Sequence, residues 1–283
     1  MASPAVRTGP KKALSEGMVA PEKDRAHSAD ILTRIVLIVE YDGSRYCGFQ
    51  LQASLPTIQG EIETALERLT GDRARVTAAS RTDSGVHARG QVVSFRTGSP
   101  LAPETFIGGL NYYLPRDIAV KVAYRVGDSF SVRRQALSRE YSYYILNSPI
   151  RSPIKAGFSY LVRGELDIKA MNQAAQALIG EHDFASFASS LGPEIKSTQR
   201  RVYQARVARE GQLVVFSMVA NSFLPHQVRN TAGALIRVGR GRMTAAEFSS
   251  IMESRKPGRA GPLAPAHGLC LIKVNYREHF EQQ

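Results

Sequence analysis

The stretch at residues 78–95, Ala-Ala-Ser-Arg-Thr-Asp-Ser-Gly-Val-His-Ala-Arg-Gly-Gln-Val-Val-Ser-Phe, places a short polar loop between two predicted strands, residues 75–79 and 91–96. Asp83 is in the middle of the loop, and Arg81 comes two residues before it. Strands on both sides would fix the loop and make it a rigid mount for a reactive group. A nearby cation keeps a carboxylate ionised, and an ionised, poorly hydrated carboxylate is a usable nucleophile or base. Asp83 is therefore the candidate catalytic residue.

The same stretch has a purely structural interpretation. Asp-Ser-Gly is ordinary turn chemistry, because Asp accepts a hydrogen bond from the backbone two residues on and Gly adopts positive φ. On the local sequence alone, this turn interpretation is at least as well supported as the catalytic one. His87 follows Asp83 by four residues, but the loop has no third ligand at metal-binding spacing. A metal site is therefore disfavoured, and His87 is interpreted as a histidine at the edge of a strand.

The composition is that of a globular protein with one large domain or two of moderate size. The chain has 283 residues, of which 43% are hydrophobic and 8% aromatic. We expect no membrane span and no signal peptide, because no apolar run has the required length or layout. The two cysteines, Cys47 and Cys270, disfavour a disulfide framework or a zinc site and are typical of a reducing compartment. We expect a cytoplasmic protein, with an organelle as the open alternative.

The charge balance indicates a polyanionic partner. Lys and Arg number 37 against 25 Asp and Glu, which gives a formal net charge of +12. Nucleic acid is the commonest intracellular polyanion. A role at a membrane surface would require a basic amphipathic helix with large apolar residues on its other face, and the sequence contains none. Charge alone does not separate a nucleic-acid enzyme from a basic binding protein.

The N-terminal residues 1–30 predict a disordered tail. They are rich in Ala, Pro, Gly, Ser and charged residues and have no periodicity. Acidic residues among the basic ones weaken the interpretation as a transit peptide without excluding it. The fold is predicted to begin near Ile31.

Local signals after the tail predict a mixture of helices and strands. Thr57 opens an amphipathic helix, and Gly71 follows its end. Residues 201–208 and 213–221, joined by a glycine turn, predict a β-hairpin. Helices and strands are intermixed in two comparable halves, with at least one hairpin. This order favours an α+β architecture with an antiparallel sheet over a doubly wound parallel sheet.

Residues 224–240 predict a helix with two contrasting faces. Its apolar face contains Leu224, Val228, Ala232 and Leu235. Its opposite face contains the basic residues His226, Arg229, Arg237 and Arg240. The usual interpretation is a surface helix with a solvated basic face. In so basic a protein, the stripe could instead bind phosphates, for which Arg is well suited.

Seven motifs, taken in order, carry a resemblance to a known family. They are Glu40-Tyr41-Asp42-Gly43 with Gly48-Phe49-Gln50, Arg81-Thr82-Asp83-Ser84-Gly85-Val86-His87-Ala88, Gly90-Gln91-Val92-Val93, Arg139-Glu140-Tyr141-Ser142-Tyr143, Asp183-Phe184-Ala185-Ser186-Phe187, Val228-Arg229-Asn230, and Ala264-Pro265 with Gly268-Leu269. Each alone is weak, but their order and spacing are highly specific. The chain resembles the TruA family of tRNA pseudouridine synthases over nearly its whole length beyond the tail. The resemblance favours the catalytic interpretation of Asp83 over the turn.

The resemblance implies an α+β fold of two pseudo-symmetric halves, residues 31–132 with the catalytic loop and residues 133–283, whose mainly antiparallel sheets join across a basic cleft. It also implies an isomerase that converts uridine to pseudouridine at positions 38, 39 and 40 of the tRNA anticodon stem-loop. The implied enzyme is a homodimer, both subunits contact tRNA, and no cofactor or metal takes part.

The resemblance also implies roles for individual residues. Asp83 would be the nucleophile, at C1′ of the ribose or at C6 of the base; these alternatives stay open. Tyr141 would pack against the target base and could take part in removing the C5 proton. Arg81 would fill the gap left by the flipped nucleotide, and Arg229 would pair with Asp83. The family usually has Trp where this chain has Phe49, a change expected to alter packing rather than chemistry.

Two other classes of function compete with the isomerase. A non-catalytic RNA-binding homologue would keep the scaffold, but loss of Asp83 would be its signature and Asp83 is present. A metal-dependent nuclease requires clustered carboxylates around paired metals. The 78–95 loop has one carboxylate, which disfavours this class.

Overall fold

The computed structural model describes residues 32–277, so the predicted tail at 1–30 lies outside the described residues. The strands are β1 (Thr33–Tyr41), β2 (Thr77–Ala78), β3 (His87–Thr97), β4 (Ile118–Val126), β5 (Ser138–Asn147), β6 (Tyr160–Val162), β7 (Gly180–Asp183), β8 (Gln199–Glu210), β9 (Leu213–Ala220) and β10 (Leu269–Asn275). The helices are α1 (Ile58–Thr70), α2 (Pro103–Tyr113), α3 (Ile168–Gln176), α4 (Gln227–Gly239) and α5 (Ala245–Ser254), with short 3-10 helices η1 (Gly43–Arg45), η2 (Ala185–Phe187) and η3 (Ala266–Gly268).

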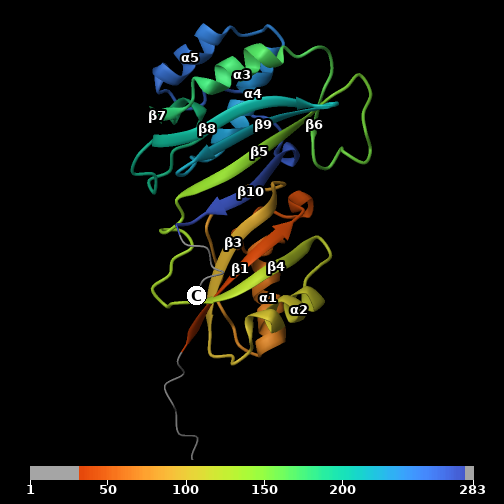
Figure 1. The fold of residues 1–283 in the computed structure, drawn as a ribbon, viewed down its shortest axis with the longest axis vertical. Coiled ribbons are helices and arrows are strands. Elements are labelled where there is room, and N and C mark those ends of the chain that lie inside the picture. The colour runs from red at the N-terminus through yellow and green to blue at the C-terminus, as the bar shows by residue number, and fades with distance from the viewer. Residues whose placement is uncertain (1–31, 278–283) are drawn as a thin grey trace, which may run out of the picture. The chain divides into compact units, whose positions relative to one another are not determined.

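The strands form one continuous sheet in the order β4-β1-β3-β10-β5-β9-β8-β7, with β2 added on β3 and β6 on β5. All neighbours are antiparallel except β10 with β3 and β6 with β5. Helices α1 and α2 lie beside the β1-β3-β4 end, and α3, α4 and α5 lie beside the β7-β8-β9 end (Figure 1). The predicted α+β fold with a mainly antiparallel sheet is therefore confirmed.

Strand β10 joins the two parts of the sheet. It comes from the end of the chain but pairs on one side with β3, where Cys270 is opposite His87, and on the other with β5, where Leu271 is opposite Tyr141. The residues that flank Asp83 therefore lie near the middle of the sheet. The predicted boundary between residues 132 and 133 falls in the connection between β4 and β5, and the division into two domains stays a prediction.

Helix α1 and the hairpin agree with their local signals. Thr57 caps α1 by accepting a hydrogen bond from the Gly60 amide at 3.2 Å, and Gly71 ends it in the left-handed conformation at φ 80°. Strands β8 and β9 pair as the predicted hairpin, and Gly211 in their turn has φ 62°. Within residues 32–277, none of the helices combines the length and apolar character needed to span a bilayer.

The strands around Asp83 differ from the prediction in length. The strand predicted at 75–79 is reduced to the two residues of β2, while the strand predicted at 91–96 begins earlier, at His87. The reason is a partner distant in sequence. The pairing of β3 with β10 extends β3 back to His87, and no pattern within residues 87–90 could show that pairing.

The interpretation of residues 224–240 as a surface helix with a solvated basic face is wrong for most of that face, since Arg240 is the one exposed residue among its four basic residues. Helix α4 is buried at eleven of its thirteen positions, because it packs between β5 on one side and α3, α5 and η2 on others. Arg229 donates from Nε to the Ala264 carbonyl at 2.9 Å, and Arg237 donates to the Gly261 carbonyl at 3.2 Å. These two guanidinium groups therefore bond to the protein interior rather than face bulk solvent.

Candidate active site

The loop between β2 and β3 that carries Asp83 is held against the turn after β1. On its upstream side, Thr82 receives a backbone hydrogen bond from Phe49 at 3.0 Å, and its hydroxyl lies 2.7 Å from the Tyr41 hydroxyl. On its downstream side, Gly85 N–H and the Ser84 hydroxyl both donate to the Tyr46 carbonyl, at 3.3 and 3.1 Å. These bonds fix the backbone on both sides of Asp83.

Two glycines allow the turn to approach the loop this closely. Gly48 has φ 93°, and a Cβ there would lie 2.9 Å from the Thr82 carbonyl oxygen. A Cβ on Gly43 would overlap the carbonyl group of Val86. Any side chain at either position would push the Asp83 loop away. Phe49, which stands where the family usually has Trp, is buried and packs its ring 6.4 Å from that of Tyr41.

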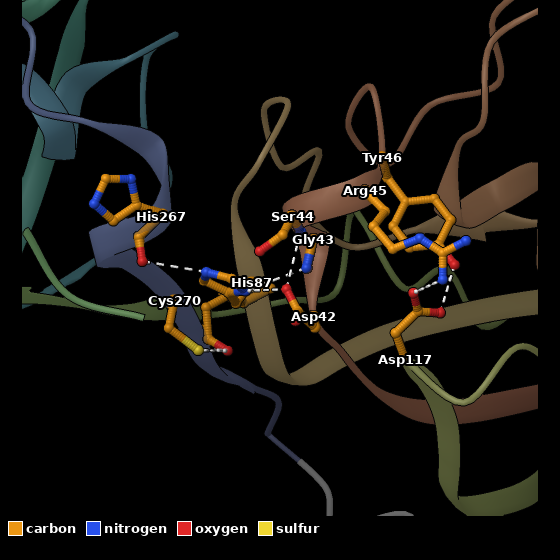
Figure 2. A network of polar contacts seen from close by, with 10 residues as sticks. Asp42, Gly43, Ser44, Arg45, Tyr46, His87, Asp117, His267 and Cys270 are labelled. Carbon is orange, nitrogen blue, oxygen red and sulfur yellow. Dashed lines mark hydrogen bonds and ion pairs between the residues drawn. The ribbon is translucent and has the colours of Figure 1, made fainter. Parts of the chain in front are cut away.

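A buried histidine links this turn to the C-terminal half of the chain (Figure 2). His87 Nδ1 accepts a hydrogen bond from Gly43 N–H at 3.2 Å and lies 3.1 Å from Asp42 Oδ1. Its Nε2 lies 3.2 Å from the backbone carbonyl oxygen of His267, just before β10. On the far side of the same turn, the Tyr46 hydroxyl donates to Asp117 Oδ1 at 2.6 Å. The His87 ring therefore holds the backbone at Gly43 and His267 in position.

The Asp83 carboxylate meets two basic side chains from the start of α4. Arg229 Nη1 lies 3.2 Å from Asp83 Oδ2 and donates a hydrogen bond to it, and His226 Nε2 lies 3.5 Å from the same oxygen. The Arg229 side chain is 12% exposed and that of Asp83 is 32% exposed. The carboxylate is thus partly desolvated and accepts a charge-assisted hydrogen bond from a guanidinium group.

Tyr141, on β5, lies in the wall of the same cleft. Its side chain is buried, its hydroxyl lies 2.9 Å from the Ser80 hydroxyl, and its ring packs edge-on against Phe223 with centroids 5.2 Å apart. Burial raises the pKa of the Tyr141 phenol to about 12. The phenol therefore stays protonated at neutral pH and offers a ring surface and an O–H group rather than a phenolate.

Arg81 does not pair with Asp83. It is exposed at the mouth of the cleft, and the structure shows no ion pair between it and the carboxylate. The expectation that the cation nearest in sequence would pair with Asp83 is therefore wrong. The arginine that pairs with Asp83, Arg229, is 146 residues away along the chain.

Arg81, Asp83, Tyr141 and His226 line a cleft with a volume of about 480 Å³. Basic side chains dominate its lining, namely Arg81, Arg133, Arg139, Lys196, Arg200 and His226. Its acidic lining residues, within the described part of the chain, are Asp83 and Glu194. Such a lining attracts a polyanion, and of these two carboxylates Asp83 is the one that pairs with a guanidinium group, that of Arg229.

Sequence reasoning missed two residues that shape this cleft. Arg139 is buried and donates to the carbonyls of Ala79 at 3.1 Å and Asn221 at 2.8 Å, which ties β5 to β2 and to the end of β9. His226 adopts the left-handed conformation at φ 61°, which turns its ring towards Asp83. Arg139 belongs to the motif at residues 139–143, but nothing in the sequence indicated its bonds to Ala79 and Asn221 or the contact of His226 with Asp83.

Unsatisfied polar atoms concentrate at the same cleft. Among residues 32–277, the buried side-chain nitrogens without a hydrogen-bond partner are Nε of Arg200, Nδ1 of His226 and Nε2 of Gln227, and all three residues line it. Buried polar groups without partners are costly and are tolerated mainly at functional sites. No group of three or more His, Cys, Asp or Glu side chains is placed to hold a metal in the described part of the chain.

The arrangement suits attack by a carboxylate on a carbon of a large anionic substrate. The carboxylate is held by an arginine, an aromatic ring lies in the cleft wall, and the surrounding cations can bind phosphates. A flat base entering the cleft could pack against the aromatic ring while its ribose approaches the carboxylate.

Comparison with known proteins agrees with this chemistry. The sequence model of the tRNA pseudouridine synthase family matches residues 37–133 and 174–277. The protein named tRNA pseudouridine synthase A from Pelobacter propionicus is 43% identical over 242 residues, which covers 86% of this chain and 99% of that protein. Proteins of the same name from a Roseiflexus species and from Photobacterium profundum are 43% and 42% identical, each over 87% of this chain and over 92% and 94% of their own lengths. This chain is a member of the TruA family of tRNA pseudouridine synthases.

Proposed function

We propose that this protein isomerises uridine to pseudouridine at positions 38, 39 and 40 of the tRNA anticodon stem-loop, with Asp83 as the nucleophile. The observation that carries the proposal is the Asp83–Arg229 pair at 3.2 Å, in a basic cleft whose wall includes the Tyr141 ring. Family membership supports the reaction, and the geometry supports the assignment of residues.

The reaction needs a nucleophile and precise positioning more than any other chemistry. The N1–C1′ bond breaks, the uracil turns over and a C5–C1′ bond forms; the C5 proton leaves and N1 gains a proton. Nothing is oxidised and no water is consumed. Asp83 can attack C1′ or C6, since its carboxylate faces the cleft from a fixed loop and either carbon of a flipped nucleotide could approach it.

Arg229 prepares the carboxylate for this attack. It donates to one oxygen, Oδ2, from a guanidinium group that Ala264 orients through Nε. A charge-assisted hydrogen bond of this kind keeps the anion in one orientation and leaves the other oxygen, Oδ1, to react.

Tyr141 and Arg81 act on the base. Stacking of a base on an aromatic ring contributes about 1–3 kcal/mol, which suits Tyr141 to hold the extruded uracil. Extrusion costs a few kcal/mol, and the exposed Arg81 side chain at the mouth can occupy the space that the nucleotide leaves. The neutral Tyr141 phenol could also relay the proton lost from C5.

We propose that the enzyme works as a homodimer in the cytoplasm, with both subunits contacting tRNA. Support for association comes from three large apolar side chains exposed between β5 and β6, Ile150, Ile154 and Phe158. Support for a reducing compartment comes from Cys47 and Cys270, which are both free thiols. Light scattering coupled to gel filtration measures the oligomeric state.

Carbodiimide mapping of pseudouridine in bulk tRNA tests the reaction and its position together. Purified protein is incubated with tRNA that lacks modifications, and each anticodon arm is read by primer extension. We expect new stops at positions 38, 39 or 40. Tight binding of tRNA without any new stop would favour the non-catalytic RNA-binding alternative, and stops confined to other arms would refute the assigned positions.

A further inference from the structure

A second pocket adjoins the catalytic cleft. It has a volume of about 390 Å³, within the range of about 300–1,000 Å³ that is usual for ligand sites. It lies among the segment after Phe49, the start of α1 and strand β2. Ala78, Arg81 and Arg133 line both cavities, so the pocket and the cleft share one wall.

A buried glutamine holds the pocket in shape. Gln59, at the start of α1, accepts a hydrogen bond from Leu51 N–H at 3.0 Å through Oε1. Its Nε2 donates to the Val76 carbonyl at 3.2 Å and to Glu63 Oε1 at 2.7 Å. The same Glu63 oxygen accepts the Val76 N–H at 2.9 Å. The two walls of the pocket, at Leu51 and at Val76, are therefore both fixed to the Gln59 side chain before any ligand enters, which lowers the entropic cost of binding.

The lining has the chemistry of a nucleotide site. Its charged residues are Arg75, Arg81 and Arg133, and no Asp or Glu is among its described lining residues. Arg75 already pairs with Glu63 at 3.4 Å. Arg81 and Arg133 are exposed, and neither has a carboxylate within 4.0 Å in the described part of the chain. These two guanidinium groups are therefore available for phosphate.

The pocket also offers contacts to a base. Leu51 is 41% exposed and presents an apolar surface. The Gln50 side chain is exposed, and its amide is not engaged in any hydrogen bond with the described residues. An apolar surface with an adjacent amide is suited to hold an unstacked base and to bond with its edge, as proteins do with single-stranded loops.

We propose that this pocket binds the nucleotide next to the target uridine in the same RNA strand. The inference rests on the proposed function, because the target uridine must occupy the cleft that contains Asp83. Arg133 would then contact the phosphate that joins the two nucleotides, since it lines both cavities, while Arg81 occupies the gap left by the flipped nucleotide. The identity of the neighbouring base would help decide which of the adjacent uridines reacts.

The test combines a protein variant that fills the second pocket with RNA transcripts that lack the base next to the target uridine. Thr77→Tyr adds a ring at an exposed lining position of β2, where an aromatic residue is well tolerated. Anticodon-arm transcripts carry an abasic nucleotide on the 5′ or the 3′ side of the target, with the target uridine labelled with tritium at C5. The rate of tritium release gives kcat/KM. Thr64→Tyr, the same change at an exposed position of α1 outside both cavities, is the matched control.

We expect one of the two abasic transcripts to react at least about 5-fold more slowly with the wild-type enzyme, the smallest effect expected from removing a stacked base. Thr77→Tyr should slow the intact transcript by a similar factor and show no additional loss with that abasic transcript. Thr64→Tyr should behave as wild type. The proposal would be overturned if the rate losses caused by Thr77→Tyr and by the abasic nucleotide multiplied when the two were combined. It would also be overturned if Thr77→Tyr left the rate with the intact transcript unchanged.

A second variant tests the phosphate contact without filling the pocket. Arg133→Gln should lower the slope of log affinity against log salt by about 0.7–0.9, as expected for one lost phosphate contact, whereas Arg68→Gln on α1 should not. An unchanged slope with Arg133→Gln would count against the pocket. If the wild-type enzyme releases no tritium from any transcript, the proposed function itself fails. If it is active but the effects of Thr77→Tyr and of the abasic nucleotide are independent, only the proposal for the second pocket is refuted.

Discussion

Replacing Gly48 by alanine tests whether the turn after β1 positions the catalytic loop. The new Cβ would lie 2.9 Å from the Thr82 carbonyl oxygen, whereas ordinary contact for a Cβ begins at 3.4 Å. The oxygen must therefore retreat by about 0.5 Å, the difference between these distances, and Asp83 is the next residue. The Phe49 N–H bond at 3.0 Å holds the same oxygen, so the loop cannot yield without losing it.

The expected effect separates into stability and rate. A non-glycine residue at φ 93° is strained by about 1–2 kcal/mol, which lowers the free energy of unfolding. A misplacement of about 1 Å can cost about 100-fold in rate, so a shift half as large predicts about a 10-fold slower reaction. Single-turnover tritium release at saturating enzyme measures this rate, and thermal unfolding measures the stability.

Gly71→Ala is the matched control. Gly71 has φ 80°, and a Cβ on this residue would meet no atom within 4 Å, so the variant carries the same strain without a clash. Gly71 ends α1, away from the cleft lining. Both variants should lose similar stability, and only Gly48→Ala should lose rate. Equal single-turnover rates for the two variants, at a temperature where both are folded, would refute the positioning argument.

Three further predictions concern Arg229, Tyr141 and salt. Arg229→Gln removes a charge-assisted hydrogen bond of about 1.5–3 kcal/mol from Asp83, so kcat/KM should fall by about 10- to 150-fold. Arg237→Gln, the control on the same helix, should lower only the melting temperature. Equal losses of activity in the two variants would contradict the role of Arg229. Burial raises the pKa of Tyr141 to about 12, so the neutral phenol contributes to the free energy of unfolding fully below its ordinary pKa of 10.0, and this contribution is lost as pH rises towards 12. Tyr141→Phe should therefore reduce the dependence of the unfolding free energy on pH between 10 and 12 by up to one proton. An unchanged pH dependence would contradict the burial of the phenol. Affinity for an anticodon-arm transcript should fall linearly with log salt, at about 0.7–0.9 per phosphate contact, and a salt-independent affinity would discredit the basic cleft.

Local signals predicted the elements whose limits depend on their own residues. The cap at Thr57 and the left-handed glycine at Gly71 set both ends of α1, because each acts within one turn of helix. The hairpin of β8 and β9 follows for the same reason, since its turn and its alternation are local. The position of Asp83 in a loop between two strands was also accessible from the sequence, because apolar runs flank the loop on both sides.

The parts that failed depend on contacts between distant residues. Helical periodicity placed Arg229 opposite the apolar face but could not show that α4 packs against β5 and three helical segments and is buried at most positions. For the same reason, proximity in the sequence suggested Arg81 as the partner of Asp83, whereas the fold brings Arg229 to it from 146 residues away. Only the resemblance to a family carried that pairing, and the neighbouring contact of His226 was not anticipated by either route.

The most direct test of the account is the activity of Asp83→Asn. Asparagine keeps the size of the side chain and can still accept a hydrogen bond from Arg229, so RNA affinity should stay within a few-fold of wild type. Single-turnover tritium release from an anticodon-arm transcript should fall to background, because an amide is not a usable nucleophile. Measurable release by a freshly purified Asp83→Asn protein, with mass spectrometry showing no reversion to aspartate, would contradict the central role of this carboxylate.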